Sequence, residues 1–328
     1  MRKASGALIL TLALFLAVLP GCSGKKETPP DIPRLENYSF NAASTLESRV
    51  GLVPTSLLKF FSRADGRADY AAYGPSDKEK ALVMEYLRLL PPVYEKVFTE
   101  RCIGIYFVSN FLGNGITSWV IGPGGKVYFY ILLNPVSFKA TLSETLTARE
   151  RSCFIPAAGW DVSVDAGKKY KGMLYSLFHE GTHGLDYARG ITPYTDDAMP
   201  EPYRPRGAVS GNFFLKTWEG YSKPLKAADF PGRDRLIFYG FGGGPKLPIA
   251  EAPAVYKGLA GSDFVSLYGA RSWAEDIAEL ATFNYITGRL GQPYVIELSG
   301  PPGKHSLRPM QSRAGKRSAE AAGFLEKL

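Results

Sequence analysis

Two of the three histidines in this chain stand four residues apart, in the sequence His179-Glu180-Gly181-Thr182-His183. On a helix, residues i and i+4 lie on one face, one turn apart, so both imidazoles can reach the same metal ion. The glutamate beside the first histidine is then held near a water molecule on that ion and can remove its proton. This spacing therefore predicts a helix that holds one Zn²⁺ on one of its faces.

The first residues of the chain are typical of an export signal. Two basic residues precede the uncharged, apolar stretch 7–19, which is too short to span a bilayer comfortably. At its end, the small residue Gly21 before Cys22 resembles a bacterial lipobox, which implies cleavage before Cys22 and lipid on its sulfur and new amino terminus. Ordinary secretion with cleavage nearby is the alternative. We therefore expect a signal peptide over 1–21, a flexible tether over 22–35, and a lipid anchor in the bacterial cell envelope.

The charge of the chain restricts its partners. The formal net charge is +8, or about +6 after Arg2 and Lys3 leave with the signal peptide (8 − 2). The positive excess lies near the C-terminal end, over 308–317. We expect no nucleic-acid partner outside the cytoplasm, whereas anionic lipid headgroups or cell-wall polymers can attract such a surface.

Two further cysteines, Cys102 and Cys153, are expected in an exported and oxidising setting. A disulfide between them would close a loop of roughly fifty residues and would stabilise the fold by about 4 kcal/mol. Two buried thiols are the alternative. Neither cysteine has a C-x-x-C partner, so we do not expect them to bind the metal.

The region 36–100 is expected to be mainly helical. Ser76 and Glu79 are spaced as a capping box at the start of a helix, and its apolar stripe stops before Pro91. A second short helix is expected over 93–99, directly after Pro91 and Pro92.

Strands are expected before the histidine helix. Three short runs rich in β-branched and aromatic residues, at 103–108, 116–121 and 127–133, are separated by glycine-rich turn signals. They predict an antiparallel meander. A zinc peptidase needs an exposed sheet edge of this kind, because an extended substrate backbone can pair with it as an extra strand.

The histidine helix itself is expected near 167–190. Gly181 and Gly184 each weaken a helix by about 1 kcal/mol relative to alanine, but small residues beside metal ligands leave room for a substrate. The segment 191–259 is rich in Pro, Gly and Tyr. We expect it to be an insertion that shapes the rim of the site.

A catalytic zinc site needs a third protein ligand besides the two histidines. Glu275 and Glu279 lie one turn apart in a segment with helical apolar spacing, so their carboxylates face the same way. His305 has no local support, and Asp186 would reach the same ion only with strain. Ser272-x-x-Glu275 is also a capping-box pattern, which would explain Glu275 without a metal and leave Glu279 as the ligand.

Two motifs taken together resemble a known family. H-E-x-x-H-x-x-D from His179 and Y-x₆-E-x-x-A-E from Tyr268 are similar to the motifs of the glutamate-ligand zincins, in particular the anthrax lethal factor-type peptidase domain. The resemblance implies that Glu275 is the third zinc ligand and that Glu279 supports a ligand histidine through a hydrogen bond. It also implies that Tyr268 steadies the oxyanion or the leaving group. We expect Asp186 and Glu279 to orient the imidazoles.

The fold that the resemblance implies is α+β: a zincin-like domain over 101–328, in which an antiparallel or mixed sheet packs on the histidine helix and a mainly helical subdomain follows. One Zn²⁺ would be held by His179, His183 and Glu275, with Glu180 as general base. We therefore expect a zinc metallopeptidase, acting as an endopeptidase on a peptide or protein substrate. A zinc-containing lipoprotein that serves envelope binding or adhesion without catalysis is the first alternative, and a metal-free surface-binding module is the second.

Overall fold

The structure is a computed structural model that describes residues 34–301 and 303–328. The expected signal peptide, the lipidation of Cys22 and most of the expected tether lie outside the described residues. All described residues belong to one unit. The region 36–100 contributes two strands to the same sheet as the residues that follow it.

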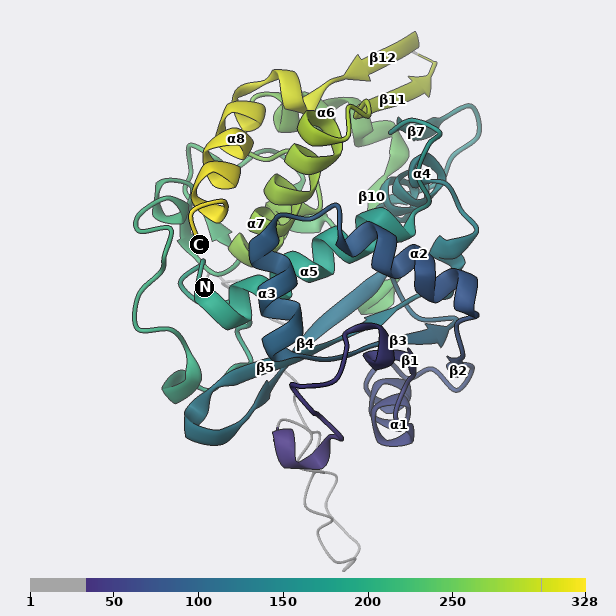
Figure 1. Cartoon of the computed structure of the whole chain (residues 1–328). Coiled ribbons are helices and arrows are strands. Elements are labelled where there is room, and N and C mark those ends of the chain that lie inside the picture. Colours follow the sequence, from purple (N-terminus) through teal and green to yellow (C-terminus); the bar gives the residue numbers. More distant parts are fainter. Residues whose placement is uncertain (1–33, 302) are drawn as a thin grey trace, which may run out of the picture. The chain divides into compact units, whose positions relative to one another are not determined.

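The described residues combine helices and strands in an α+β arrangement, as expected (Figure 1). The helices are α1 (Thr55–Ala64), α2 (Asp77–Leu87), α3 (Pro92–Arg101), α4 (Leu142–Ser152), α5 (Met173–Arg189), α6 (Ala252–Ala260), α7 (Trp273–Asn284) and α8 (Arg313–Leu325). The strands are β1 (Val50–Leu52), β2 (Ala71–Tyr73), β3 (Cys102–Ser109), β4 (Gly115–Ile121), β5 (Val127–Leu133), β6 (Phe154–Ile155), β7 (Asp161–Asp165), β8 (Trp218–Gly220), β9 (Lys223–Pro224), β10 (Leu247–Pro248), β11 (Val295–Gly300) and β12 (Gly303–Leu307). None of the helices within the described ranges is long and apolar enough to cross a membrane.

The main sheet is mixed, and the expected meander is wrong. Its strand order is β1-β3-β5-β4. The short strand β2 pairs antiparallel with the last residues of β3, from Phe107 to Ser109. β3 and β5 are parallel neighbours, and β4 crosses over to pair antiparallel with β5 on its far side. The apolar strands β3 and β5 occupy the middle because both their faces are covered, whereas only two residues of β4 are buried, which suits an edge.

The edge position of β4 leaves one side of its backbone largely unpaired. Within the described residues, the outer side of β4 makes a single bridge, between Ile121 and Arg34. The rest of the strand, from Gly115 to Val120, therefore presents N–H and C=O groups that an extended chain could pair with.

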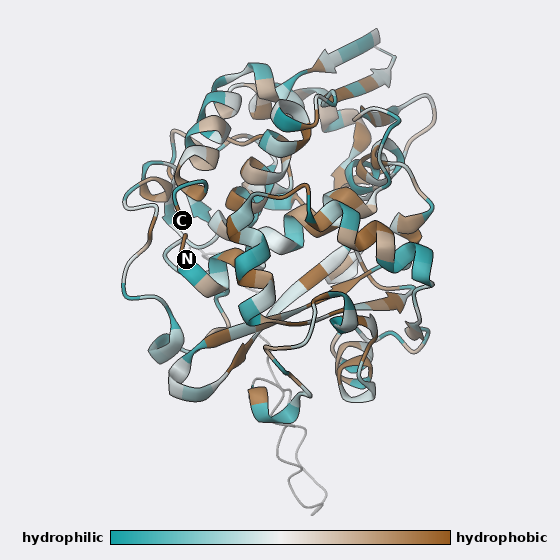
Figure 2. Cartoon of the chain, viewed as in Figure 1, coloured by the Kyte–Doolittle hydropathy of each residue, from teal (hydrophilic) through white to brown (hydrophobic). Residues whose placement is uncertain are grey.

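The two faces of the main sheet pack against different helices (Figure 1). One face packs against Leu57 and Phe61 of α1 through residues such as Tyr130 and Leu132. On the other face, α3 and α5 cover alternate residues of the same strands, such as Ile131. Figure 2 shows hydrophobic residues along these strands, while the surrounding helices alternate between hydrophobic and hydrophilic residues.

The histidine helix, α5, is shorter at its start than expected. It begins at Met173 rather than near residue 167, because the backbone of residues 170–172 pairs with that of residues 140–142. Residues 161–165 form β7 in a second sheet, with strand order β12-β11-β7. The helix ends as expected at Gly190, whose φ of 63° is left-handed and favours glycine.

The glycines of α5 make room for the core and not for a substrate. A Cβ atom at Gly184 would lie 2.5 Å from the ring of Phe129, and one at Gly181 would lie 3.2 Å from the ring of Phe98. The two glycines therefore let the helix lie close to β5 and α3.

Much of the segment 191–259 is packed into the core. It contains α6 and three very short strands, and several of its large side chains are buried. These are Phe214, Trp218, Phe230 and Phe238. Trp218 also donates a hydrogen bond from Nε1 to the buried carboxylate of Asp276 in α7, at 2.8 Å. The segment thereby fixes the position of α7.

Local signals before residue 101 are confirmed. Ser76 and Glu79 form the capping box of α2, with both reciprocal hydrogen bonds present. The second expected helix is α3, which starts at Pro92, where the missing N–H of proline costs nothing.

The expected disulfide is wrong, because Cys102 and Cys153 are both free and buried. Their thiols contact different groups. The Cys102 Sγ atom lies 3.6 Å from the carbonyl oxygen of Gly104, and Cys153 ends α4 beside Glu150. Burial raises the pKa of both thiols, that of Cys102 to about 12, so neither is a reactive thiolate at neutral pH.

We predict that Gly184→Ala destabilises the protein, since the new methyl group would meet the buried ring of Phe129. The expected loss in the free energy of unfolding is about 1–3 kcal/mol, measured by chemical denaturation. Gly323→Ala in α8 is the matched control, because nothing lies within 4 Å of a Cβ atom there. That variant should be unchanged or up to about 1 kcal/mol more stable. Equal effects at the two positions would contradict the close packing of α5 on β5.

Candidate metal centre

The two histidines of α5 point their Nε2 atoms at one another. His179 and His183 lie one helical turn apart, and their Nε2 atoms are 3.2 Å apart. His179 is only 4% exposed, and the side chain of His183 is 11% exposed. The pair is therefore largely buried rather than on an open surface.

Glu275 joins the histidines from α7. Its Oε2 atom lies 3.0 Å from Nε2 of His179 and 3.5 Å from Nε2 of His183. Ser272 caps α7 by accepting a hydrogen bond from the backbone N–H of Glu275, but the Glu275 carboxylate faces the histidines instead of closing a capping box. The helix cap and the triad therefore use different parts of the same residue, and the two interpretations from the sequence do not exclude one another.

The spacing of the three donor atoms fits a small tetrahedral cation. Zinc ligands lie about 2.0–2.1 Å from the ion, so two ligands at a tetrahedral angle are about 3.3 Å apart. The three separations in the triad are 3.0, 3.2 and 3.5 Å. Two imidazole nitrogens and one carboxylate oxygen are also the donor set of many catalytic zinc sites, which keep a fourth position for water.

Glu279, one turn after Glu275, holds His179 from the other side of its ring. The Nδ1 atom of His179 lies 2.8 Å from Oε1 of Glu279. When Nδ1 donates its proton to this carboxylate, Nε2 keeps a free lone pair directed at the triad. Glu275 and Glu279 therefore occupy different sides of one imidazole, and of the two only Glu275 can share an ion with both histidines.

The charges around the triad favour a positive group between the carboxylates. Burial lowers the pKa of His179, but hydrogen bonds to Glu275 and Glu279 outweigh burial and raise that pKa to about 10. Burial also opposes the charge of both carboxylates, yet His179 holds the pKa of Glu275, and Arg149 that of Glu279, well below the usual range. A divalent cation would supply the same positive charge and leave both imidazoles neutral.

Three residues that the sequence interpretation missed complete the surroundings of Glu279. Arg149 of α4 donates a hydrogen bond to Oε2 at 2.7 Å, as does Ser266 at 2.5 Å, and Tyr175 donates one to Oε1 at 2.7 Å. Arg149 is fully buried and also pairs with Glu150. Tyr175 precedes His179 by one turn on the same helix face, so the i, i+4 spacing could have predicted that it lies beside the site. No sequence signal pointed to Arg149.

Glu180 contacts the edge strand β4. The hydroxyl of Thr117 in β4 is 2.8 Å from Oε2 of Glu180 and 2.8 Å from its backbone carbonyl oxygen. Gly115 lets the strand approach, since a Cβ atom there would lie 3.0 Å from Cγ of Glu180 and 2.7 Å from the side chain of Leu133. Burial raises the pKa of Glu180, which brings this carboxylate closer to the basicity that a proton acceptor needs.

Tyr268 lies next to the triad. The centre of its ring is 5.6 Å from that of His179. Burial, together with the negative charge of Glu275, raises its pKa well above the usual value. Its hydroxyl therefore keeps its proton and can donate a hydrogen bond.

Asp186 does not orient an imidazole, contrary to expectation. Its Oδ1 atom accepts hydrogen bonds from the backbone N–H groups of Ile191 and Thr192, and its Oδ2 atom accepts one from the hydroxyl of Thr192 at 2.6 Å. Asp186 lies near the end of α5, where the turn after the helix presents these donors. Nδ1 of His183 is buried and has no hydrogen-bond partner among the described residues.

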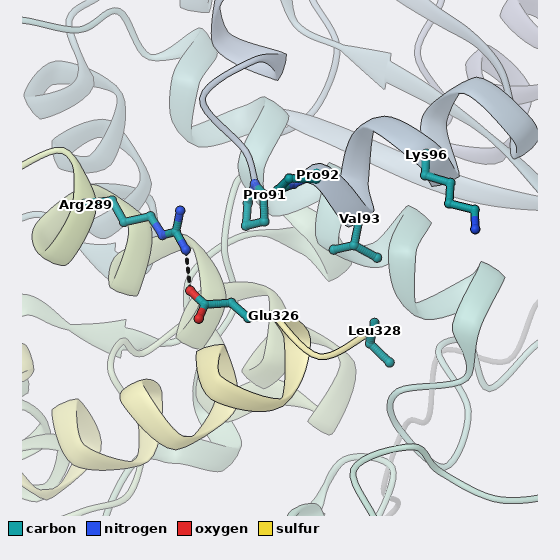
Figure 3. A pocket seen from close by; sticks show the side chains of 7 residues that line it. All are labelled: Pro91, Pro92, Val93, Lys96, Arg289, Glu326 and Leu328. Carbon is teal, nitrogen blue, oxygen red and sulfur yellow. Dashed lines mark hydrogen bonds and ion pairs between the residues drawn. The ribbon is translucent and has the colours of Figure 1, made fainter.

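The third histidine and a groove beside α3 lie outside the metal centre. His305 is exposed on β12. A groove of about 460 Å³ lies between α3, the turn after α7 and the end of α8 (Figure 3), and its lining contains no member of the triad. The groove is lined by Pro91, Pro92, Val93, Lys96, Arg289, Glu326 and Leu328.

Comparisons of the chain with protein-family models, with curated proteins and with solved structures find no match. The interpretation of the site therefore depends on its own geometry and chemistry.

We predict that the purified protein binds one zinc ion per chain and that His183→Ala abolishes this binding. The reason is that His183 supplies one of the three donors of the triad. Metal content after dialysis against trace zinc is the measurement. His305→Ala is the matched control, because it removes an exposed histidine and should leave the stoichiometry unchanged. Equal zinc content in the two variants would contradict the assignment of the triad.

Proposed function

We propose that the protein is a zinc-dependent peptidase with a zincin-like arrangement. The observation that carries the proposal is the convergence of His179, His183 and Glu275 within 4.8 Å of one another, with Glu180 adjacent to His179 in the sequence. The mixed sheet packed on α5, and the helix α7 that brings in Glu275, support the same interpretation. The glutamate-ligand zincins therefore stay the family that the motifs resemble.

The chemistry needs a cation and a base. Bound Zn²⁺ would polarise the peptide carbonyl group and lower the pKa of a water molecule. Glu180 accepts the proton of this water as its oxygen attacks the carbonyl carbon. The same carboxylate then gives the proton to the departing amine, so the C–N bond breaks and one water is consumed per acid and amine released. Thr117 binds Oε2 of Glu180, which leaves Oε1 for the proton transfer.

Two further features suit a peptide substrate. The protonated hydroxyl of Tyr268 can donate a hydrogen bond to the carbonyl oxygen as negative charge develops there. The unpaired side of β4 offers backbone groups to an extended peptide. Thr117 on that strand binds Glu180, so a peptide paired with β4 would pass close to the base.

The location of the protein is proposed from residues outside the described ranges. The export signal and Cys22 favour a protein held in the bacterial cell envelope by lipid. A zinc-containing envelope-binding or adhesion lipoprotein without catalysis has the same anchor and the same triad, so activity has to distinguish the two.

We predict that Glu180→Gln lowers peptide hydrolysis by about 10²–10⁴-fold, the usual contribution of a general base. Zinc content should stay at the wild-type level, because Glu180 is not one of the three donors. The measurement is cleavage of a broad peptide library by the zinc-loaded proteins, read by mass spectrometry. A wild-type protein that binds zinc but cleaves nothing would favour the non-catalytic lipoprotein. Equal cleavage by the variant and the wild type would show that Glu180 is not the general base.

A further inference from the structure

Arg271 brings an additional positive charge to the edge of the metal centre. It is the last residue of the short helix Gly269–Arg271, and its guanidinium carbon lies 5.5 Å from the ring centre of Tyr268. In the part of the chain that the structure describes, it forms no ion pair, whereas Arg149 and Arg317 each bind a buried carboxylate. The side chain is half-buried and so remains reachable from solvent.

The charge of Arg271 is maintained by its neighbours. Burial lowers the pKa of this guanidinium, but the nearby Tyr268 and Glu275 raise it above the usual value. The guanidinium is a rigid fork of donors that matches the two oxygens of a carboxylate. A guanidinium that forms no direct ion pair among the described residues keeps its donors available for an anionic group of the substrate.

Tyr239 lies between Tyr268 and the residues that precede β4. Its hydroxyl accepts a hydrogen bond from Nδ2 of Asn114 at 2.9 Å, and its ring centre lies 6.1 Å from that of Tyr268. The ring also packs against Gly113, where a Cβ atom would lie 3.3 Å away. Tyr239 has a φ of 58°, a conformation that costs a bulky residue about 1–3 kcal/mol. Its contacts, including the bond from its N–H to Ser152, hold it there.

The direction of β4 decides which end of a peptide meets Tyr239 and Arg271. β4 starts at Gly115, directly after Asn114. A peptide paired antiparallel with β4 would have its carboxyl end at that start, and a peptide paired in parallel would have its amino end there. The guanidinium attracts a carboxylate and repels an ammonium group. The charge of Arg271 therefore favours the antiparallel peptide, with its carboxyl end towards Tyr239.

We propose that Arg271 binds the terminal carboxylate of the substrate, so that the protein removes a short segment from the carboxyl end of a peptide. This inference depends on the proposed peptidase function, and it replaces the endopeptidase expected from the sequence with a peptidase that acts at the carboxyl end. Thr117, which binds the base, and Asn114, which binds Tyr239, are three residues apart in the chain. An extended strand covers roughly 10 Å in that distance, so about three residues fit beyond the cleaved bond.

The first experiment compares cleavage of one peptide library prepared with free carboxyl ends and again with carboxamide ends. The zinc-loaded wild type should cleave the free acids with a kcat/KM at least about tenfold higher, the size of a hydrogen bond to a charged group. It should release fragments of one to about three residues. Arg271→Gln should lose this preference, and Arg271→Lys should keep part of it. Arg289→Gln, which alters a surface ion pair with Glu326, is the control and should retain the preference.

The second experiment measures binding without turnover. Zinc-loaded Glu180→Gln protein is titrated with a panel of N-acetyl tripeptides as acids and as amides, with and without Arg271→Gln. Tighter binding of the acids that depends on Arg271 supports the inference, even if the wild type cleaves nothing and the proposed function fails. Equal binding of acids and amides overturns the inference. Cleavage of amidated peptides only beside Asp or Glu side chains also overturns it, because the guanidinium would then bind a side-chain carboxylate. Cleavage of both libraries at internal bonds overturns the inference while the peptidase function stands.

Discussion

The buried carboxylate of Glu279 is the interaction on which the metal centre depends. It accepts hydrogen bonds from Arg149 of α4, from Tyr175 and His179 of α5, and from Ser266, which precedes α7. Breaking a buried pair of this kind costs about 3–5 kcal/mol, because the remaining charge is left uncompensated. The orientation of His179, and with it the direction of Nε2, is therefore set by the packing of three segments that lie far apart in the sequence.

The main sheet supplies the other half of the site. Because β5 lies between β3 and β4, β4 becomes the edge strand. The hydroxyl of its Thr117 contacts Glu180 of α5. The glycines of α5 and β4 permit this close approach. Tyr239 lies beside Tyr268 and binds Asn114, which directly precedes β4. The two histidines and the base lie on α5, whereas Glu275 lies on α7 and Thr117 on β4. The site therefore depends on how these three elements pack.

Local features could be predicted from the sequence, and long-range ones could not. The capping box at Ser76 and the turn that separates Glu275 from Glu279 follow from short-range periodicity, and the structure contains both. The order of the strands depends on which of them can be covered on both faces, which spacing alone does not reveal. Arg149 lies 130 residues from Glu279, so only the folded chain brings them together. Asp186 was misjudged because its partners belong to the turn after the helix.

The most direct test of the account is a crystal structure of the zinc-loaded protein with anomalous data collected at the zinc edge. The account predicts one ion bound by Nε2 of His179, Nε2 of His183 and a carboxylate oxygen of Glu275, at about 2.0–2.2 Å. Glu279 should remain on Nδ1 of His179. An ion bound through Glu279, an ion held elsewhere, or no ion at the triad would contradict it.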